Sequence, residues 1–147
     1  MPTLSARSLE HLGTCCDELQ RVARRAIAIY DFTVLEGHRG KDAQDQAVAK
    51  GLSQVAWPNG KHNKNPSDAM DVAPFPIDWS DKEVARQRFC LLAGVMLACA
   101  AAEGVTLRWG GDWDRDGDTR DERFRDLPHF EVVRTLPTAA TNVEAGG

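Results

Sequence analysis

Residues 61–74 read KHNKNPSDAMDVAP, a polar loop that runs into a short apolar stretch and stops at a proline. Asparagine, proline and serine are typical of a loop, whereas the apolar residues that follow predict a strand over residues 69–73. The loop would hold His62 and the strand Asp71. By themselves, a histidine and an aspartate nine positions apart are a weak signal, because a turn histidine and a strand-end aspartate give the same pattern.

Another histidine, His129, lies far downstream in the segment DLPHFE at residues 126–131. Two imidazoles and one carboxylate suit zinc, and catalytic zinc takes three protein ligands with a fourth position left for water. No fourth ligand is evident beside His62, Asp71 and His129, which favours a catalytic site over a structural one.

Four segments in a fixed order carry a resemblance to a known family. They are EGHR at residues 36–39, the stretch from His62 to Asp71, RWGGD at residues 108–112, and DLPHFE at residues 126–131. Over roughly residues 5–134 the chain resembles the zinc D-Ala-D-Ala carboxypeptidase and L-alanyl-D-glutamate endopeptidase family. Within it, the chain is most similar to the single-domain branch that bacteriophages use as endolysins.

The resemblance implies a role for each matching residue. His62, Asp71 and His129 would bind zinc, Asp126 would be the catalytic base, and Arg39 would contact the substrate. The chain departs from the family in two places. Gly60 stands where a serine is common, and the interval from His62 to Asp71 is two residues longer than usual. A loop insertion around residues 65–67 would absorb the longer interval.

The chemistry expected of these residues can be argued without the family. Zinc lowers the pKa of bound water from about 15.7 towards 7 and polarises a carbonyl group. Asp126 could take the proton of that water and pass it to the leaving amine. Arg39 offers a positive charge to a substrate carboxylate or a developing oxyanion. Blander alternatives stay open, since Arg39 could be a turn arginine and Asp126 could cap the turn at residues 127–128.

The remaining histidines, His11 and His38, compete for the metal on composition alone. His11 lies in an N-terminal helical segment, where we expect it at the surface or the edge of the core. His38 is adjacent to Arg39, and we expect it to line the cleft and contact the substrate.

An acidic segment, DWDRDGDTRD at residues 112–121, suggests a second metal. Asp112, Asp114 and Asp116 followed by glycine resemble the opening of a calcium loop, in which alternating oxygens converge on the ion. The closing glutamate of an EF-hand would fall at position 123, which is Arg123, and no second amphipathic helix follows. The sequence therefore allows Ca²⁺ without an EF-hand, and the alternative is a solvated acidic loop.

Length and composition limit the organisation and the partners. With 147 residues and 42% hydrophobic content, we expect a single peptidase domain over residues 1–134 and a flexible C-terminal tail over residues 135–147. A formal net charge of -4 argues against nucleic acid as the main partner. The resemblance implies the peptidoglycan stem peptide as the partner, and we expect a monomer.

The four cysteines, Cys15, Cys16, Cys90 and Cys99, show no Cys-x-x-Cys spacing, so we expect buried free thiols formed in a reducing compartment. The N-terminus lacks the pattern of a signal peptide. An apolar run over residues 89–102, about 14 residues long, is shorter than a membrane span, so no membrane insertion is expected. For an endolysin, these features imply residence in the cytoplasm of the infected host until release to the cell wall.

The periodicity of the chain predicts an α+β fold. Helices are expected from a capping box at Asp17 and Gln20, over residues 42–50, and from a second capping box at Ser80 and Glu83. The last helix is apolar nearly all round, which predicts a buried central helix. Strands are expected over residues 32–35, 69–73, 105–109 and 129–133, with His129 beside Asp71. The predicted fold is a small antiparallel sheet packed against helices with a zinc cleft, as in the Hedgehog and D-Ala-D-Ala peptidase group.

These expectations point to a zinc peptidase of the peptidoglycan stem peptide, most simply an endolysin that cleaves between L-Ala and D-Glu. A D,D-carboxypeptidase that removes terminal D-Ala is an alternative with the same metal ligands. A non-catalytic, metal-bearing wall-binding domain is a third, although such a domain would have no need of a base at Asp126.

Overall fold

The computed structural model describes residues 1–134. The tail expected over residues 135–147 lies outside the described residues. The elements are α1 (Ala6–Leu12), α2 (Asp17–Ala26), β1 (Phe32–Glu36), α3 (Lys41–Ala49), the 3-10 turn η1 (Lys61–Asn63), β2 (Ala69–Pro74), α4 (Glu83–Ala102), β3 (Leu107–Gly110) and β4 (Asp126–Val132).

A four-stranded antiparallel sheet of order β1-β2-β4-β3 forms the centre of the fold and confirms the predicted α+β class. Because side chains alternate along a strand, each central strand presents one face to the core and one away from it. The core face carries Met70, Val72, Phe130 and Val132. The opposite face carries Asp71 and His129, whose Cα atoms are paired partners across β2 and β4.

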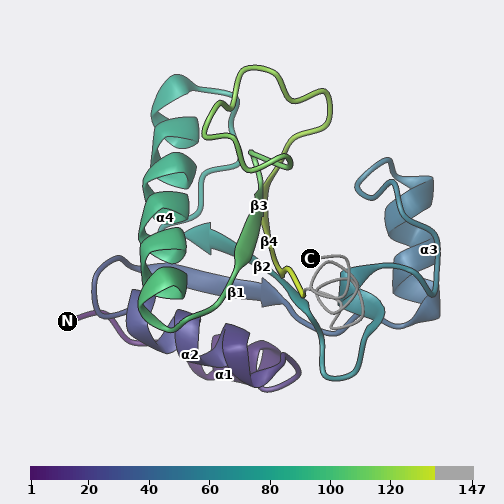
Figure 1. Cartoon of the computed structure of the whole chain (residues 1–147), viewed down its shortest axis with the longest axis horizontal. Coiled ribbons are helices and arrows are strands. Elements are labelled where there is room, and N and C mark those ends of the chain that lie inside the picture. Colours follow the sequence, from purple (N-terminus) through teal and green to yellow (C-terminus); the bar gives the residue numbers. More distant parts are fainter. Residues whose placement is uncertain (135–147) are drawn as a thin grey trace, which may run out of the picture.

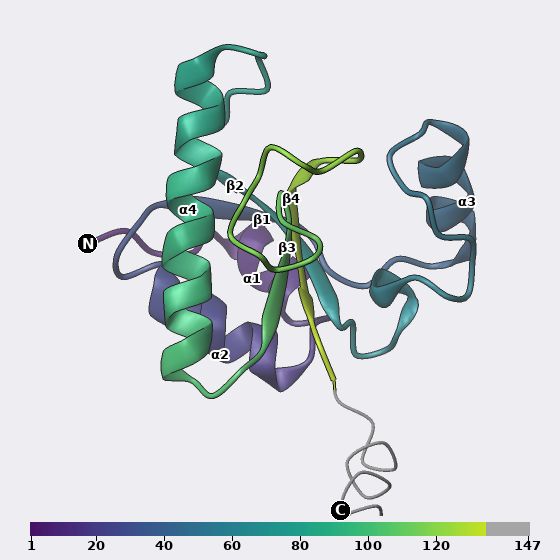
Figure 2. The ribbon, with the colours of Figure 1, turned by 45° about the horizontal axis from the view of Figure 1, so that its top comes forward.

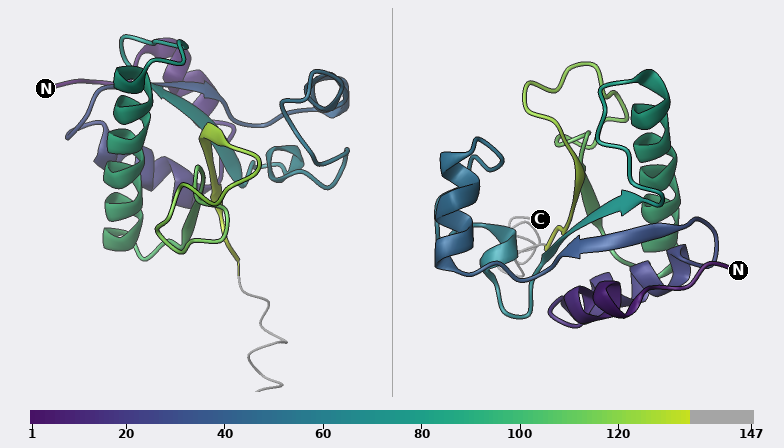
Figure 3. Two further views of the ribbon diagram at one scale, coloured as in Figure 1. Left: turned by 90° about the horizontal axis from the view of Figure 1, so that it is seen from above. Right: turned by 180° about the vertical axis from the view of Figure 1, so that it is seen from behind.

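Helices cover the two sides of the sheet unequally. α1 contacts β1, and α2 and α4 contact each other and the strands, so these three helices enclose the main core. Figure 1 shows α3 on the other side of the sheet from α4, and the views in Figures 2 and 3 agree. The polar face of the sheet is therefore flanked by α3 and η1, while its apolar face is covered by helices.

Helix α4 differs from the expected buried central helix. Phe89, Leu92 and Met96 are buried against the sheet, but Val84 and Leu91 on the outer side are 62% and 56% exposed. The thiol expected to be buried at Cys90 is exposed for the same reason, while the other three free cysteines are buried. The apolar composition of α4 concealed that only one side of it meets the core.

The apolar run of residues 89–102 is part of a longer helix. α4 has 20 residues, and an 18-residue stretch of it has a mean hydropathy of 1.4, so the helix is long and apolar enough to span a bilayer by these two criteria. One such helix is weak evidence, because core helices that pack through one face meet the same criteria.

Neither predicted capping box forms. α2 begins at Asp17 after Cys16, and Gln20 donates to the Cys15 carbonyl at 3.0 Å instead of closing a box. α4 begins at Glu83, so Ser80 lies outside the helix, where its amide donates to Asp78.

Candidate functional site

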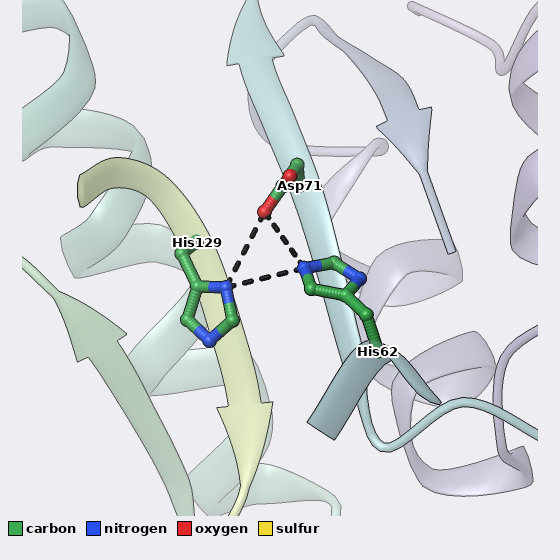
Figure 4. Close-up of side chains that lie close together, drawn as sticks. All are labelled: His62, Asp71 and His129. Atoms are coloured by element: carbon green, nitrogen blue, oxygen red, sulfur yellow. Dashed lines mark hydrogen bonds and ion pairs between the residues drawn. The ribbon is translucent and has the colours of Figure 1, made fainter. Parts of the chain in front are cut away.

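Three side chains from separate elements converge on the polar face of the sheet. Asp71 projects from β2, His129 from the neighbouring β4, and His62 from η1 (Figure 4). Asp71 Oδ1 lies 3.1 Å from His62 Nε2 and 3.4 Å from His129 Nδ1, and the two nitrogens are 3.2 Å apart. The long interval between His62 and Asp71 therefore does not displace the aspartate, as its loop absorbs the added residues.

Hydrogen bonds on the far side of each imidazole fix which nitrogen carries a proton. His62 Nδ1 donates to the Gly37 carbonyl at 2.7 Å, and His129 Nε2 donates to Glu131 at 2.8 Å. In the neutral rings, the two inner nitrogens are then both acceptors, and they face the Asp71 carboxylate. Three acceptors that meet at one point repel one another unless a cation lies between them, so this group is suited to bind a metal ion.

The ionisation of these groups shows the same attraction for positive charge. Burial opposes protonation of His129, but its hydrogen bonds to Asp71 and Glu131 outweigh burial and raise the pKa of His129 to about 9. Burial also opposes ionisation of Asp71, yet His62 and His129 hold the pKa of that carboxyl well below its usual range. A proton and a metal ion would therefore compete for the same position.

Asp126 reaches the same face as His129 because β4 is irregular. Trp109 pairs with Phe130, but Gly110, the next residue on β3, pairs with Asp126, so residues 127–129 bulge out of the β3 ladder. In a regular strand, residues three apart point to opposite faces. A Cβ on Gly110 would clash with the Asp126 carbonyl oxygen, which explains the glycine in the RWGGD segment.

The environment of Asp126 suits a general base near neutral pH. Burial and, after it, the negative charge of Asp71 raise the pKa of Asp126 to about 6. The side chain lines two clefts, of about 430 and 390 Å³, that meet beside the metal-ligand group. A carboxylate in this position can accept a proton from a water held in the cleft.

Arg39 lies at the wall of the clefts, but its guanidinium is held by the protein. Nε and Nη2 donate to the two oxygens of Glu36 at 2.9 and 3.0 Å, and Nη1 donates to Gln44 at 3.0 Å. Nη2 also lies 3.4 Å from Asp71 Oδ2. Arg39 thus steadies the oxygen of Asp71 that faces away from the histidines, and its expected contact with the substrate stays a prediction.

His38 does not occupy the expected position. Its Nδ1 donates to the Lys64 carbonyl at 2.9 Å, its amide donates to Thr14, and its side chain lines neither of the two clefts. Adjacent side chains of an extended backbone point in opposite directions. Because Arg39 points into the cleft, its neighbour His38 points away from it. His11 is likewise outside the metal-ligand group.

Three further residues support the site and carried no assigned role in the sequence. Glu131 is 5% exposed and accepts from both His129 and Arg108 at 2.8 Å. Burial opposes its ionisation, but these hydrogen bonds lower the pKa of Glu131 to about 2. The Trp113 ring packs against His129 with centroids 5.3 Å apart. The spacing His-x-Glu on a strand, which places both side chains on one face, was a usable signal for Glu131.

The acidic loop brings its predicted residues together. Oxygens of Asp112, Asp114 and Asp116 lie within 4.8 Å of one another. The amides of Asp116 and Gly117 both donate to Asp112, at 3.2 and 2.9 Å, so the loop folds back on its first carboxylate. No helix follows within the described chain before β4 begins, which agrees with the exclusion of an EF-hand.

Comparisons with known proteins agree with this geometry. The family model for phage L-alanyl-D-glutamate peptidase matches residues 2–133. The L-alanyl-D-glutamate peptidase of Escherichia phage T5 is 37% identical over 134 residues, which cover 86% of this chain and 94% of the relative. The crystal structure of the Serratia marcescens L-Ala D-Glu endopeptidase ChiX superposes with a TM-score of 0.69 at 27% identity, covering 90% of this chain and 91% of the other. The chain therefore belongs to the phage L-alanyl-D-glutamate peptidase family.

Proposed function

We propose that this chain is a zinc-dependent endopeptidase that hydrolyses the bond between L-Ala and D-Glu in the peptidoglycan stem peptide. One observation carries the proposal: three acceptor atoms converge beside Asp126, a carboxyl group with a raised pKa, where two clefts meet. Membership of the L-alanyl-D-glutamate peptidase family supports the choice of bond.

The spacing of the three atoms supports zinc. Ligands about 2.0–2.1 Å from a tetrahedral ion lie roughly 3.3–3.4 Å from one another, as bond length and tetrahedral angle require. The separations here are 3.1, 3.2 and 3.4 Å. His62, Asp71 and His129 would hold the ion, and Glu131 and Arg39 would keep two of these ligands in place.

Zinc bound there would polarise the scissile carbonyl and acidify the attacking water. Asp126 would accept the proton of this water and donate it to the nitrogen of D-Glu as the peptide bond breaks. With a pKa of about 6, the carboxyl group is ionised at neutral pH but remains basic enough to hold the proton between the two steps. The reaction consumes one water and releases a free carboxylate on L-Ala and a free amine on D-Glu.

Digestion of purified peptidoglycan by the wild-type protein and by His129→Ala tests the proposal, with mass spectrometry of the products. A new N-terminal D-Glu that His129→Ala fails to release would support it. Release of terminal D-Ala alone would instead identify a D,D-carboxypeptidase. Equal release by both proteins would exclude metal-dependent hydrolysis, and no release by a zinc-loaded wild-type protein would favour a binding domain.

For the acidic loop we propose Ca²⁺, because Asp112, Asp114 and Asp116 offer hard oxygen ligands within reach of a single ion. Calorimetric titration of Ca²⁺ into the wild-type protein and into Asp114→Asn tests this. A binding isotherm that the substitution weakens is expected, and identical isotherms, or none, would identify a solvated acidic loop.

A further inference from the structure

Arg108 is a second arginine beside the metal-ligand group, and its support of Glu131 uses only one of its hydrogen-bond donors. It lies on β3, directly across from Glu131 of β4, and its side chain is 33% exposed and lines the larger cleft. Within residues 1–134, its guanidinium makes one hydrogen bond, from Nη2 to Glu131 at 2.8 Å. Its Nε is buried and has no partner among the described residues.

An unpartnered donor in this position is unusual. Leaving a buried polar group without a hydrogen bond is costly, and native proteins rarely do so. A guanidinium is also planar, and its remaining N–H groups are suited to an oxygen anion. Because the side chain is 33% exposed and lines the cleft, the N–H groups at its exposed end are open to an acceptor that arrives from the cleft.

The other two cationic side chains that line this cleft, Arg39 and Lys61, also have hydrogen-bond partners in the protein. Arg39 lies between the carboxylates of Glu36 and Asp71, which neutralise its charge. Lys61 donates from Nζ to the Val132 carbonyl at 3.2 Å. Of the cationic side chains that line this cleft within residues 1–134, Arg108 has the largest number of N–H groups without a hydrogen bond. Its charge is partly offset by Glu131.

The position of Arg108 relative to the metal ligands sets the distance to such an acceptor. His129 and Glu131 are neighbours on one face of β4, paired with Asp71 and Arg108 respectively. Two residues along a strand span roughly 7 Å, so Arg108 lies about one such step from the metal-ligand group. A carboxylate on the residue after the scissile bond, a few bonds from the carbonyl under attack, is within that reach.

The proposed substrate carries such a group. In the stem peptide, D-Glu continues the chain through its side-chain carboxyl, so its α-carboxylate is free and adjacent to the scissile nitrogen. We propose that Arg108 binds this α-carboxylate and makes the enzyme specific for an anionic residue after the scissile bond. This inference rests on the proposed function, since it names the partner of Arg108 in that reaction.

A matched pair of synthetic stem peptides tests the inference. Both contain L-Ala joined to D-Glu, one with a free α-carboxylate and the other with the α-carboxamide, and kcat/KM is measured for each. We expect the wild-type protein to prefer the carboxylate by about 10- to 100-fold, the loss expected for one hydrogen-bonded charge. Arg108→Gln should remove the preference by slowing cleavage of the carboxylate peptide.

Arg108→Gln can also disturb Glu131 and, through it, His129. Such an effect would slow both peptides by the same factor and lower the zinc content, whereas loss of the carboxylate contact changes the ratio between the peptides. Lys61→Gln, which removes a second charge from the same cleft, is the matched control and should leave the ratio unchanged. Equilibrium binding of both peptides to Asp126→Asn, with and without Arg108→Gln, gives a readout that does not depend on turnover.

Several outcomes would overturn the inference. A wild-type protein that cleaves both peptides equally has no carboxylate specificity, and a preference that survives Arg108→Gln does not come from Arg108. A preference lost in Lys61→Gln alone would assign the role to Lys61. Failure of the zinc-loaded wild-type protein to cleave either peptide or peptidoglycan would refute the proposed function itself, and with it this inference.

Discussion

Replacing Glu131 by glutamine tests whether the hydrogen bonds behind the metal ligands set metal affinity. Glu131 is buried and accepts one hydrogen bond from His129 Nε2 and one from Arg108, both at 2.8 Å. A glutamine of the same shape has one acceptor oxygen, so in either orientation its NH₂ group faces a donor. Either His129 or Arg108 is then left unsatisfied, at a cost of about 1–3 kcal/mol.

The loss should appear in zinc affinity, because Glu131 fixes the orientation of His129 and raises its basicity. Substitutions at such positions typically cost about 10–100-fold in metal affinity, equivalent to ~1.4–2.7 kcal/mol. Competition with a chromophoric chelator at pH 7 measures the dissociation constant directly. Glu103→Gln is a matched control, because Glu103 pairs with Arg21 and Arg25 at the far end of α4. A zinc affinity for Glu131→Gln within twofold of wild type would refute the reasoning.

Three further predictions concern the base and its support. Asp126→Asn should lower kcat by about 10²–10⁴-fold while zinc content stays unchanged, and loss of zinc in this variant would contradict a role as base. Because burial raises the pKa of Asp126 to about 6 and only the ionised form accepts a proton, kcat/KM should fall as pH decreases through about 6. A bound dication would lower the pKa of Asp126 and shift this fall in kcat/KM to lower pH. A fall in kcat/KM that begins above pH 7 would therefore exclude Asp126 as its source. Gly110→Ala should destabilise the protein by about 1–3 kcal/mol and reduce kcat, measured by urea unfolding and peptide hydrolysis, because its Cβ meets the Asp126 backbone. Gly40→Ala, where a Cβ meets nothing within 4 Å, is the control, and equal effects of the two would refute the steric argument.

The metal-ligand group was predicted because the resemblance to a known family joined two local patterns. Apolar residues around Asp71 and around His129 predicted a strand at each place, and the resemblance implied that these two residues and His62 lie together, as they do in the structure. The positions of the strands could be predicted from the composition and the hydrophobic periodicity of short segments, and these can be read from the sequence directly.

The supporting residues could not be predicted in the same way, because they depend on register and direction. The contact between Glu131 and Arg108 exists only because those two residues pair across β3 and β4. The hydrogen bonds of Arg39 to Glu36 and Gln44 depend on the turn that brings these two side chains to its guanidinium group. The outer face of α4 was misjudged because composition states how apolar a helix is but not how much of it meets the core.

The bulge at residues 127–129 makes metal binding and hydrolysis separable by a change of chain length. His129 is held by its pairing with Asp71 on β2, whereas Asp126 is held by Gly110 on β3. Deleting one residue between them would leave the histidine in register and turn the carboxylate towards the core. A single short deletion could thus convert a hydrolase into a protein that still takes up metal and stem peptide but no longer cuts, without altering any ligand.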